Sequence, residues 1–309
     1  MSAQQIQHHI AELIQATQLS VAKPLLQTLH HKTETQYGTQ SDEHLQTLLL
    51  IACWHTAAGE YEAAKPLLQR LAEYPHLTDA KIALAKLYRE CGAYPNAQTL
   101  LQELLPKLPE NSIQYAQAQN EMGLVLLGLE HPNQALTQFE HAAALFQQLC
   151  GEHHLHTVRA FRNVATVYRI QRHHKEALSV LNSLLSISEN LYPHSHPETA
   201  EILAEIAQLH DECGEHALST PLYQRAIAIL SQTLGEQHPL FARLLCRHAI
   251  HFMQQRLPEK ALPLLHQAAV IYLNVFDETH PAVQNLLRFI VIMQLMSDGF
   301  FPDVDTVIQ

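Results

Sequence analysis

Apolar residues recur along the chain at intervals of three and four, the spacing that places side chains on one face of an α-helix. A small residue anchors this pattern and recurs at steps of 42, 33, 38, 42, 42 and 42: Ala22, Ala64, Ala97, Ala135, Ala177, Ser219 and Ala261. A large apolar residue lies four positions after each small one, from Leu26 to Leu265, and a further apolar residue follows three positions later. Each small residue therefore marks the buried face of one predicted helix.

A second column of small residues lies twelve positions before the first: Ala52, Ala85, Gly123, Ala165, Ala207 and Ala249. Small side chains there let a neighbouring helix approach closely, so each unit is predicted to be a pair of helices joined by a tight turn. Gly59, Gly92 and Gly214 occupy three of these turns, where a left-handed backbone is easiest for glycine. The fourth and seventh pairs have no glycine at the turn.

Nearly identical segments of sequence also recur 42 residues apart, as in AKPLLQTL at 22–29 and AKPLLQRL at 64–71. Four histidines at positions 154, 196, 238 and 280 are also 42 residues apart, and the last three precede proline. Because the residue before proline avoids helix and proline favours the first helical turn, each His-Pro is expected to mark a helix start. Such helix pairs cannot bury an apolar face alone, but a stack of them can.

The sequence therefore predicts an all-α stack of antiparallel helix pairs. Seven pairs are expected, followed by a further helix and a tail: 3–31, 45–75, 78–109, 116–151, 155–192, 197–234 and 239–276, then 281–296 and 297–309. No Gly/Ser-rich linker or low-complexity tract interrupts the pattern, so a single domain over residues 1–309 is expected.

Several of these segments resemble a known family. GEYEAAKPLLQRL at 59–71 and CGAYPNAQTLLQEL at 91–104 resemble the turn and second helix of the tetratricopeptide repeat. The 42-residue spacing, with TLGEQHP at 233–239 and FDETHP at 276–281, is similar to the longer subtype of kinesin light chains and many bacterial scaffolds. The resemblance covers residues 45–295 and implies a right-handed superhelical solenoid with a concave groove lined by the first helices. His55 and His210 depart from it, because the family usually has an aromatic there.

The composition of the chain argues against some classes of partner and indicates a cellular location. The formal net charge of −11 argues against nucleic acid as a general partner, and few lysines without a polybasic run argue against an anionic membrane surface. No apolar run reaches about 18 residues, and the N-terminus has no signal-peptide pattern, so a cytoplasmic protein is expected. No phosphate loop, GxSxG or HExxH motif occurs, which predicts a protein that is not an enzyme and needs no cofactor.

Twenty-three histidines raise the question of metal binding. Two loops are rich in histidine, GEHHLHT at 151–157 and PHSHPE at 193–198. The favoured interpretation is structural, as helix starts, and no metal ligand is predicted. A transition-metal ridge along the loop edge and a response to protons are the alternatives. The five cysteines form no CxxC pair and are expected to pack as small apolar residues.

The candidate binding residues come from the register of the first helices. They are Arg159, Arg162, Asn163, Thr166, Glu201, Glu205, Gln208, Arg243, Arg247, Asn285 and Arg288. The resemblance implies that Asn163 matches an asparagine that holds the ligand backbone in peptide-binding members. The lysine clamp of that family for a C-terminal carboxylate is not visible, since Leu50 and Ala83 occupy the matching places.

Two interpretations of these charges stay open. The arginines suit carboxylates of an acidic peptide, because a guanidinium binds a carboxylate through two donors. Alternatively they pair internally, Arg159 and Arg162 with Glu201 and Glu205, and Glu205 with Arg247.

Two further surfaces are apolar. In the first three pairs the inward positions Leu49, Leu50, Cys53, Ile82 and Ala83 lie beside Trp54, which favours ordinary packing over a groove for an amphipathic helix. The last helix, PAVQNLLRFIVIMQLM, is apolar nearly all round and should be covered. Either the tail with Phe300 and Phe301 covers it, or a second copy does, and weak homodimerisation through residues 281–301 is predicted.

The expected function is a non-catalytic scaffold or adaptor that binds a peptide or helix of another protein in the concave groove. The alternative is a regulatory sensor that binds a small peptide in the groove, or a metal ion or protons at its histidine-rich loop edge. Ligand-, metal- or pH-dependent melting would distinguish the sensor from the scaffold.

Overall fold

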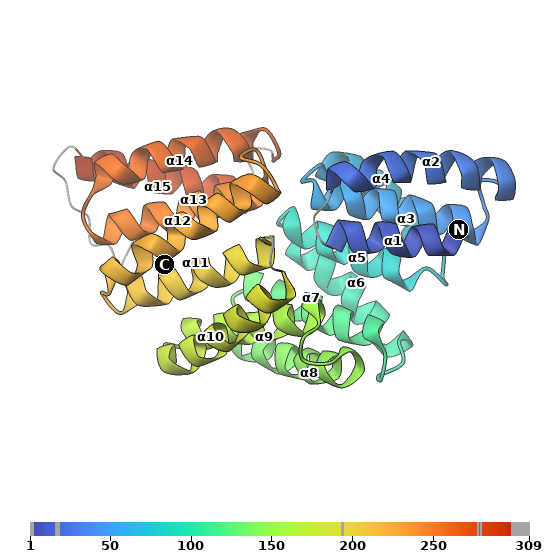
Figure 1. Cartoon of the computed structure of the whole chain (residues 1–309), viewed down its shortest axis with the longest axis horizontal. Coiled ribbons are helices and arrows are strands. Elements are labelled where there is room, and N and C mark those ends of the chain that lie inside the picture. Colours follow the sequence, from blue (N-terminus) through green and yellow to red (C-terminus); the bar gives the residue numbers. More distant parts are fainter. Residues whose placement is uncertain (1–2, 16–18, 193–194, 277, 279, 298–309) are drawn as a thin grey trace. The chain divides into compact units, whose positions relative to one another are not determined.

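The computed structural model describes residues 3–15, 19–192, 195–276, 278 and 280–297. Within those residues the chain forms α-helices and one short 3₁₀ helix, and it has no strand (Figure 1). The helices are α1 (Ala3–Gln15), α2 (Leu19–Tyr37), α3 (Asp42–Ala57), α4 (Tyr61–Ala72), α5 (Thr78–Glu90), α6 (Tyr94–Leu104), η1 (Leu105–Lys107), α7 (Ile113–Gly128), α8 (Pro132–Cys150), α9 (Leu155–Ile170), α10 (His174–Leu191), α11 (Pro197–Glu212), α12 (His216–Thr233), α13 (Pro239–Gln254), α14 (Pro258–Leu273) and α15 (Pro281–Ser297). The predicted all-α class is confirmed.

The helices belong to two compact units, an N-terminal unit of residues 1–172 and a C-terminal unit of residues 173–309. In the N-terminal unit, α1–α2, α3–α4, α5–α6 and α7–α8 pack as successive pairs, and α9 packs on α8. In the C-terminal unit, α11–α12 and α13–α14 are the pairs, α10 packs on α11, and α15 packs on α14. The division between the units falls inside the predicted pair 155–192, and the single domain over 1–309 stays a prediction.

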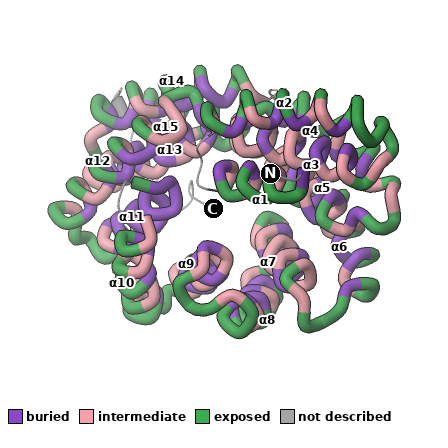
Figure 2. Tube along the Cα trace, turned by 45° about the vertical axis from the view of Figure 1, so that its right-hand side comes forward, coloured by how far each residue is buried: buried purple, intermediate pink, exposed green. Residues whose placement is uncertain are grey.

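The two columns of small residues are where the paired helices meet. All seven residues of the first column, from Ala22 to Ala261, are fully buried. In the second column the alanines are buried as well, and Gly123 faces the ring of Phe139 so closely that a Cβ would lie 2.6 Å from Phe139 Cε1. Figure 2 shows buried and exposed residues alternating along the helices, which is the pattern of a helix with one covered face.

In the part of the chain that the structure describes, the tight turns after α3, α5, α7, α9, α11 and α13 each contain one residue in the left-handed backbone conformation. Gly59, Gly92 and Gly214 have φ of 78°, 72° and 78°, as their positions predict. The fourth and seventh pairs use Glu130 (φ 62°) and Arg256 (φ 58°) at the same place, and the fifth pair, which also has no glycine there, uses Arg172 (φ 64°). The turn geometry therefore persists where its sequence signal is missing.

The 42-residue histidines cap the first helices. His154, His196, His238 and His280 directly precede α9, α11, α13 and α15. Each Nδ1 accepts a hydrogen bond from the backbone N–H two residues later, at 3.2, 3.0, 3.1 and 3.1 Å. The rings also stack, His196 on Tyr192 at 4.0 Å and His280 on Phe276 at 3.8 Å between centroids. The prediction that His-Pro marks a helix start is confirmed, and an N-cap explains it.

Candidate functional site

Four of the predicted binding residues lie on α9 in the N-terminal unit. Arg159, Arg162 and Thr166 are half-buried, and Asn163 is buried. The Asn163 amide donates to Asn120 Oδ1 on α7 at 2.9 Å, and the Thr166 hydroxyl donates to the Arg162 carbonyl at 3.1 Å. The amide that the family resemblance assigns to a ligand backbone thus joins two successive first helices.

The C-terminal unit brings three predicted residues together across α11 and α13. Arg243 Nη2 donates to Glu201 Oε2 at 2.8 Å, and Arg247 Nη1 lies 3.7 Å from the same oxygen. The Glu201 side chain is only 7% exposed, whereas those of Arg243 and Arg247 are 41% and 22% exposed. One buried carboxylate therefore holds two arginines at the surface of the first helices.

The remaining predicted residues of this unit lie on α11 and α15. Glu205 is buried on α11, and Gln208 donates to Glu212 Oε1 at 3.3 Å, one turn further along the same helix. Arg288 and Asn285 are exposed on α15. Arg243 and Arg247 thus pair internally with Glu201, whereas the sequence suggested Glu205 for Arg247 and named no partner for Arg243.

A comparable charged cluster in the N-terminal unit was missed from sequence. Arg89 on α5 donates through Nε to Glu121 Oε2 on α7 at 2.9 Å and through Nη2 to the adjacent Glu90 at 2.9 Å. Burial alone would lower the pKa of Arg89, but Glu121 and Glu90 outweigh it and raise that pKa. The guanidinium stays charged and links two first helices. Opposite charges 32 residues apart were the only available signal.

The first helices of the N-terminal pairs are packed rather than grooved at their apolar positions. Leu49, Ile82 and Trp54 are buried, whereas Leu50, Cys53 and Ala83 are half-buried. The Trp54 indole N–H donates to the Leu19 carbonyl at 2.9 Å. Burial raises the pKa of the Cys53 thiol to about 11. The packing interpretation of these positions is therefore favoured by the structure.

The five cysteines differ in their exposure to solvent. All five are free thiols. Burial raises the pKa of Cys246 to about 12 and also raises that of Cys150, so these thiols stay protonated at neutral pH. Cys213 is exposed, which corrects the expectation that every cysteine packs inside.

His55 and His210, which replace a family aromatic, have a shared role at the turn. Each ring Nδ1 lies against a glutamate five residues later, Glu60 Oε2 at 2.6 Å and Glu215 Oε2 at 2.7 Å. Both glutamates precede the second helix of their pair. Where the family usually has an aromatic side chain, each of these histidines therefore forms a hydrogen bond across the turn to the residue before the second helix.

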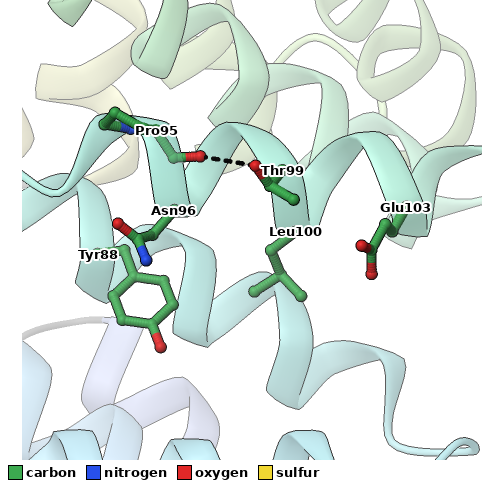
Figure 3. A pocket seen from close by; sticks show the side chains of 6 residues that line it. All are labelled: Tyr88, Pro95, Asn96, Thr99, Leu100 and Glu103. Carbon is green, nitrogen blue, oxygen red and sulfur yellow. Dashed lines mark hydrogen bonds between the residues drawn. The ribbon is translucent and has the colours of Figure 1, made fainter.

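A shallow hollow lies on α5 and α6 of the N-terminal unit. It is lined by Tyr88, Pro95, Asn96, Thr99, Leu100 and Glu103, which Figure 3 shows as sticks. The Thr99 hydroxyl donates to the Pro95 carbonyl at 3.0 Å. Glu103 is the single carboxylate in this set and has no imidazole or thiol beside it there, so the hollow does not offer an acid–base pair.

Comparison with known proteins finds matches to repeat proteins. Three regions match models of the tetratricopeptide repeat, residues 55–121, 114–190 and 199–240, which together exceed half of the chain. The human Clustered mitochondria protein homolog is 30% identical over 107 residues, which are 35% of this chain and 8% of that protein. Protein KINESIN LIGHT CHAIN-RELATED 3 of Arabidopsis thaliana is 28% identical over 168 residues, 50% of this chain and 26% of that protein. The chain thus matches about a quarter or less of the length of these relatives.

Two solved structures share the fold at low sequence identity. A Rap protein complexed with Competence and Sporulation Factor has a TM-score of 0.57 at 13% identity, over 96% of this chain and 99% of that one. The APC/C hetero-tetramer Cut9-Hcn1 has a TM-score of 0.60 at 13% identity, over 92% of this chain and 48% of that one.

None of the helices that the structure describes has the length and apolar character that crossing a lipid bilayer requires. The buried columns of small residues, the left-handed turns and the three matched regions agree with one another. The chain therefore belongs to the tetratricopeptide repeat family, with repeats of the kinesin-light-chain-like kind.

Proposed function

We propose that this protein is a scaffold without chemistry of its own, and that it binds a peptide or helix of another protein along its first helices. The observation that carries the proposal is the pair of arginines, Arg243 and Arg247, held at the surface by one buried carboxylate. The named complexes of two structural relatives, one with Competence and Sporulation Factor and one of Cut9 with Hcn1, give general support.

The partner is proposed to be acidic at the point where it meets these arginines. The Arg243 side chain is 41% exposed, and a guanidinium fork matches a carboxylate of a partner in geometry and charge. Glu201 fixes the fork in place, so less side-chain entropy is lost on binding. The remaining predicted residues, Arg159, Arg162, Asn163, Thr166, Glu205, Gln208 and Arg288, are proposed to extend the surface on their own helices.

The same proposal places the protein in the cytoplasm, with no nucleic acid, membrane or cofactor as partner. The net charge of −11 supports this choice of partner, because a nucleic-acid backbone or an anionic lipid surface attracts basic proteins.

The test removes the arginine cluster without leaving a buried charge behind. In the variant Glu201→Gln/Arg243→Gln/Arg247→Gln, all three charges are replaced by amides that still form hydrogen bonds. Retention of partners from native lysate by the full chain is expected to fall at least tenfold, since losing charged hydrogen bonds at an interface costs about 2–5 kcal/mol.

A matched control exists on the second helices. Arg225 on α12 donates to Glu189 on α10 at 2.6 Å, and both side chains are about half exposed. Glu189→Gln/Arg225→Gln is expected to retain the same partners as the wild type. Equal retention by both variants, with circular dichroism showing that both are folded, would reject the arginine cluster as the binding site.

The last helix is proposed to bind a second copy weakly. Leu287, Val291 and Leu295 are exposed and lie four residues apart, so they form one apolar stripe along α15. Sedimentation velocity is expected to show a concentration-dependent dimer that Val291→Glu abolishes. Val21→Glu, at an equally exposed valine of α2, is the control. A monomer at all concentrations would contradict the proposal. The predicted contribution of Phe300 and Phe301 lies outside the described residues.

A further inference from the structure

Three elements of the C-terminal unit bring a carboxylate and two imidazoles to one point. Asp211 lies near the end of α11, His216 begins α12, and His251 lies near the end of α13. Asp211 Oδ1 is 2.7 Å from His251 Nδ1 and 3.0 Å from His216 Nδ1. One ligand atom from each of the three residues lies within 4.8 Å of the other two.

The repeat register shows that this polar cluster replaces apolar packing. At the position of His251, ten residues before the small residue of the next helix, the other pairs have Trp54, Leu87, Val125, Val167 and Leu209, all of them buried. His251 is fully buried as well. In the first column of small residues, Ser219 is the one hydroxyl among alanines. Two apolar positions of this layer have therefore become polar together, which ordinary packing between repeats does not require.

The hydrogen bonds of Asp211 are divided unevenly between its oxygens. Oδ1 meets His251, His216 and the Ser219 hydroxyl, the last at 2.5 Å. Oδ2 is buried and has no hydrogen-bond partner among the described residues, and Asp211 as a whole is only 5% exposed, so bulk water does not reach this oxygen. A buried carboxylate oxygen without a partner costs free energy, so its retention calls for a ligand that uses it. A cation bound at this carboxylate is attracted by both of its oxygens, so it would offset the cost of leaving Oδ2 without a donor.

We propose that Asp211, His216 and His251 bind a divalent transition-metal ion, with Zn²⁺ as the best match. Imidazole nitrogen and carboxylate oxygen are both zinc ligands, at about 2.0–2.2 Å from the metal. In a tetrahedron of that radius the ligand atoms are ~3.3 Å apart, so the present separations of 2.7 and 3.0 Å need only small side-chain shifts. The His216 side chain is 30% exposed, which leaves an entry path and room for a water as the fourth ligand.

The surrounding residues supply the outer hydrogen bonds that such a site needs. When His251 Nδ1 binds a metal, its proton resides on Nε2, and Thr220 Oγ1 lies 3.1 Å from Nε2 to accept it. The Gln255 amide nitrogen lies 2.7 Å from His251 Nε2. When Nε2 carries the proton, a turn of this amide by half a rotation brings its oxygen to that place as a second acceptor. The Ser219 hydroxyl orients the carboxylate through Oδ1. Outer partners of this kind fix the tautomer and orientation of metal ligands.

A metal at this point would connect α11, α12 and α13, and hence two successive helix pairs of the C-terminal unit. This role is independent of the proposed binding of an acidic partner, because Arg243 and Arg247 are not among the ligands. Binding at this site is expected to raise the melting temperature of the C-terminal unit by linkage.

The experiment uses the full chain without an affinity tag, stripped of metal by a chelator that is then removed. Titration with ZnCl₂ by calorimetry is expected to show one ion per chain at micromolar affinity or tighter, and MgCl₂ and CaCl₂ are expected to give no binding. His216→Gln removes a ligand and Thr220→Val removes the outer acceptor of His251. Each is expected to weaken zinc binding by at least ~10-fold. His210→Gln is the matched control, because His210 pairs with Glu215 at 2.7 Å without a third ligand.

The zinc affinities of the wild type and the three variants distinguish the possible results. Weakening by His216→Gln and Thr220→Val, with no change in His210→Gln, supports the site. Absence of saturable zinc binding by the wild type overturns it. Zinc binding that is equal in the wild type, His216→Gln and Thr220→Val also overturns it, because the ion then lies at other histidines. If His216→Gln does not fold, as judged by circular dichroism, Thr220→Val decides, since that change removes no charge and no ligand.

Discussion

Replacing Phe139 with alanine is expected to lower the free energy of unfolding of the N-terminal unit by about 3–5 kcal/mol. The ring is fully buried on α8 and belongs to a core cluster that includes Ala97, Leu101 and Val125. It lies in the space that Gly123 leaves open on α7, where the three nearest ring atoms are 2.6–2.9 Å from an ideal Cβ position. Removing it leaves a cavity that stiffly packed helices cannot close. Urea denaturation followed by circular dichroism measures the loss.

The effect of alanine at position 123 should then change sign with the residue at position 139. In the wild type, Gly123→Ala forces the Cβ into the ring, and overpacking of this kind costs about 1–3 kcal/mol. That cost equals or exceeds the ~1 kcal/mol that alanine gains over glycine within a helix, so the net change is expected to be destabilising. In the Phe139→Ala background the ring is absent, so the same change is expected to stabilise by about 1 kcal/mol.

The four proteins form a double-mutant cycle, which isolates the contact from the separate effects of each change. A coupling energy of about 1–3 kcal/mol is expected between positions 123 and 139. Ala207→Gly, at the corresponding position of α11, is the control and should simply destabilise, because alanine already fits there. Additive effects of Gly123→Ala and Phe139→Ala would show that the close approach of the two helices does not depend on glycine.

The contact between positions 123 and 139 could be predicted from the sequence because both residues belong to the repeating pattern of the helix pairs. Gly123 and Phe139 occupy fixed positions of the repeat, and a helix pair brings those positions together whatever the residues are. The same reasoning predicted the buried alanines, the left-handed glycines and the helix starts after His196 and His238. Periodic features were predictable because one local interaction, repeated, determines them all.

Departures from the period were not predictable in the same way. The Arg89–Glu121 and Asp211–His251 contacts depend on which rotamers meet between first helices, 32 and 40 residues apart. The register of the first helices suggested Glu205 as a partner of Arg247, and it did not identify Glu201 as the carboxylate that both Arg243 and Arg247 approach. Ser219 was visible as the exception among the alanines, and its meaning became clear only when the residues around it were in place. Such exceptions within a regular repeat are therefore the positions to inspect for function.

His248 is a second exception, and its replacement by leucine is expected to stabilise the C-terminal unit by about 1–3 kcal/mol at pH 7.5. The other helix pairs have Ile51, Leu84, Met122, Val164 and Ile206 at this position. The ring of His248 stacks on Tyr223 at 5.1 Å, and both of its nitrogens are buried without a hydrogen-bond partner. Leucine keeps the apolar contact and removes the two unsatisfied polar atoms.

The gain is expected to increase in acid. Burial, together with the nearby His251, lowers the pKa of His248 from 6.5 to about 4, while Asp211 acts in the opposite direction. Because the folded pKa lies below the unfolded one, the unfolded chain binds the extra proton. The wild type is therefore most stable above pH 6.5 and loses stability as the pH falls toward 4. At pH 5 this penalty is about 2 kcal/mol, and the leucine variant does not have it.

Comparison of thermal and urea unfolding of the two proteins at pH 7.5 and pH 5 tests this account. The four capping histidines and the other imidazoles are present in both proteins, so their titration cancels in the difference. His266→Leu is the control, because His266 is exposed on the neighbouring helix α14, and it should change stability by less than about 0.5 kcal/mol at either pH. A leucine variant that is less stable than the wild type at pH 7.5, or that loses stability equally in acid, would show that His248 forms a favourable interaction in the folded chain. The expected result instead makes His248 a polar residue that the fold tolerates at a cost, next to the cluster of Asp211, His216 and His251.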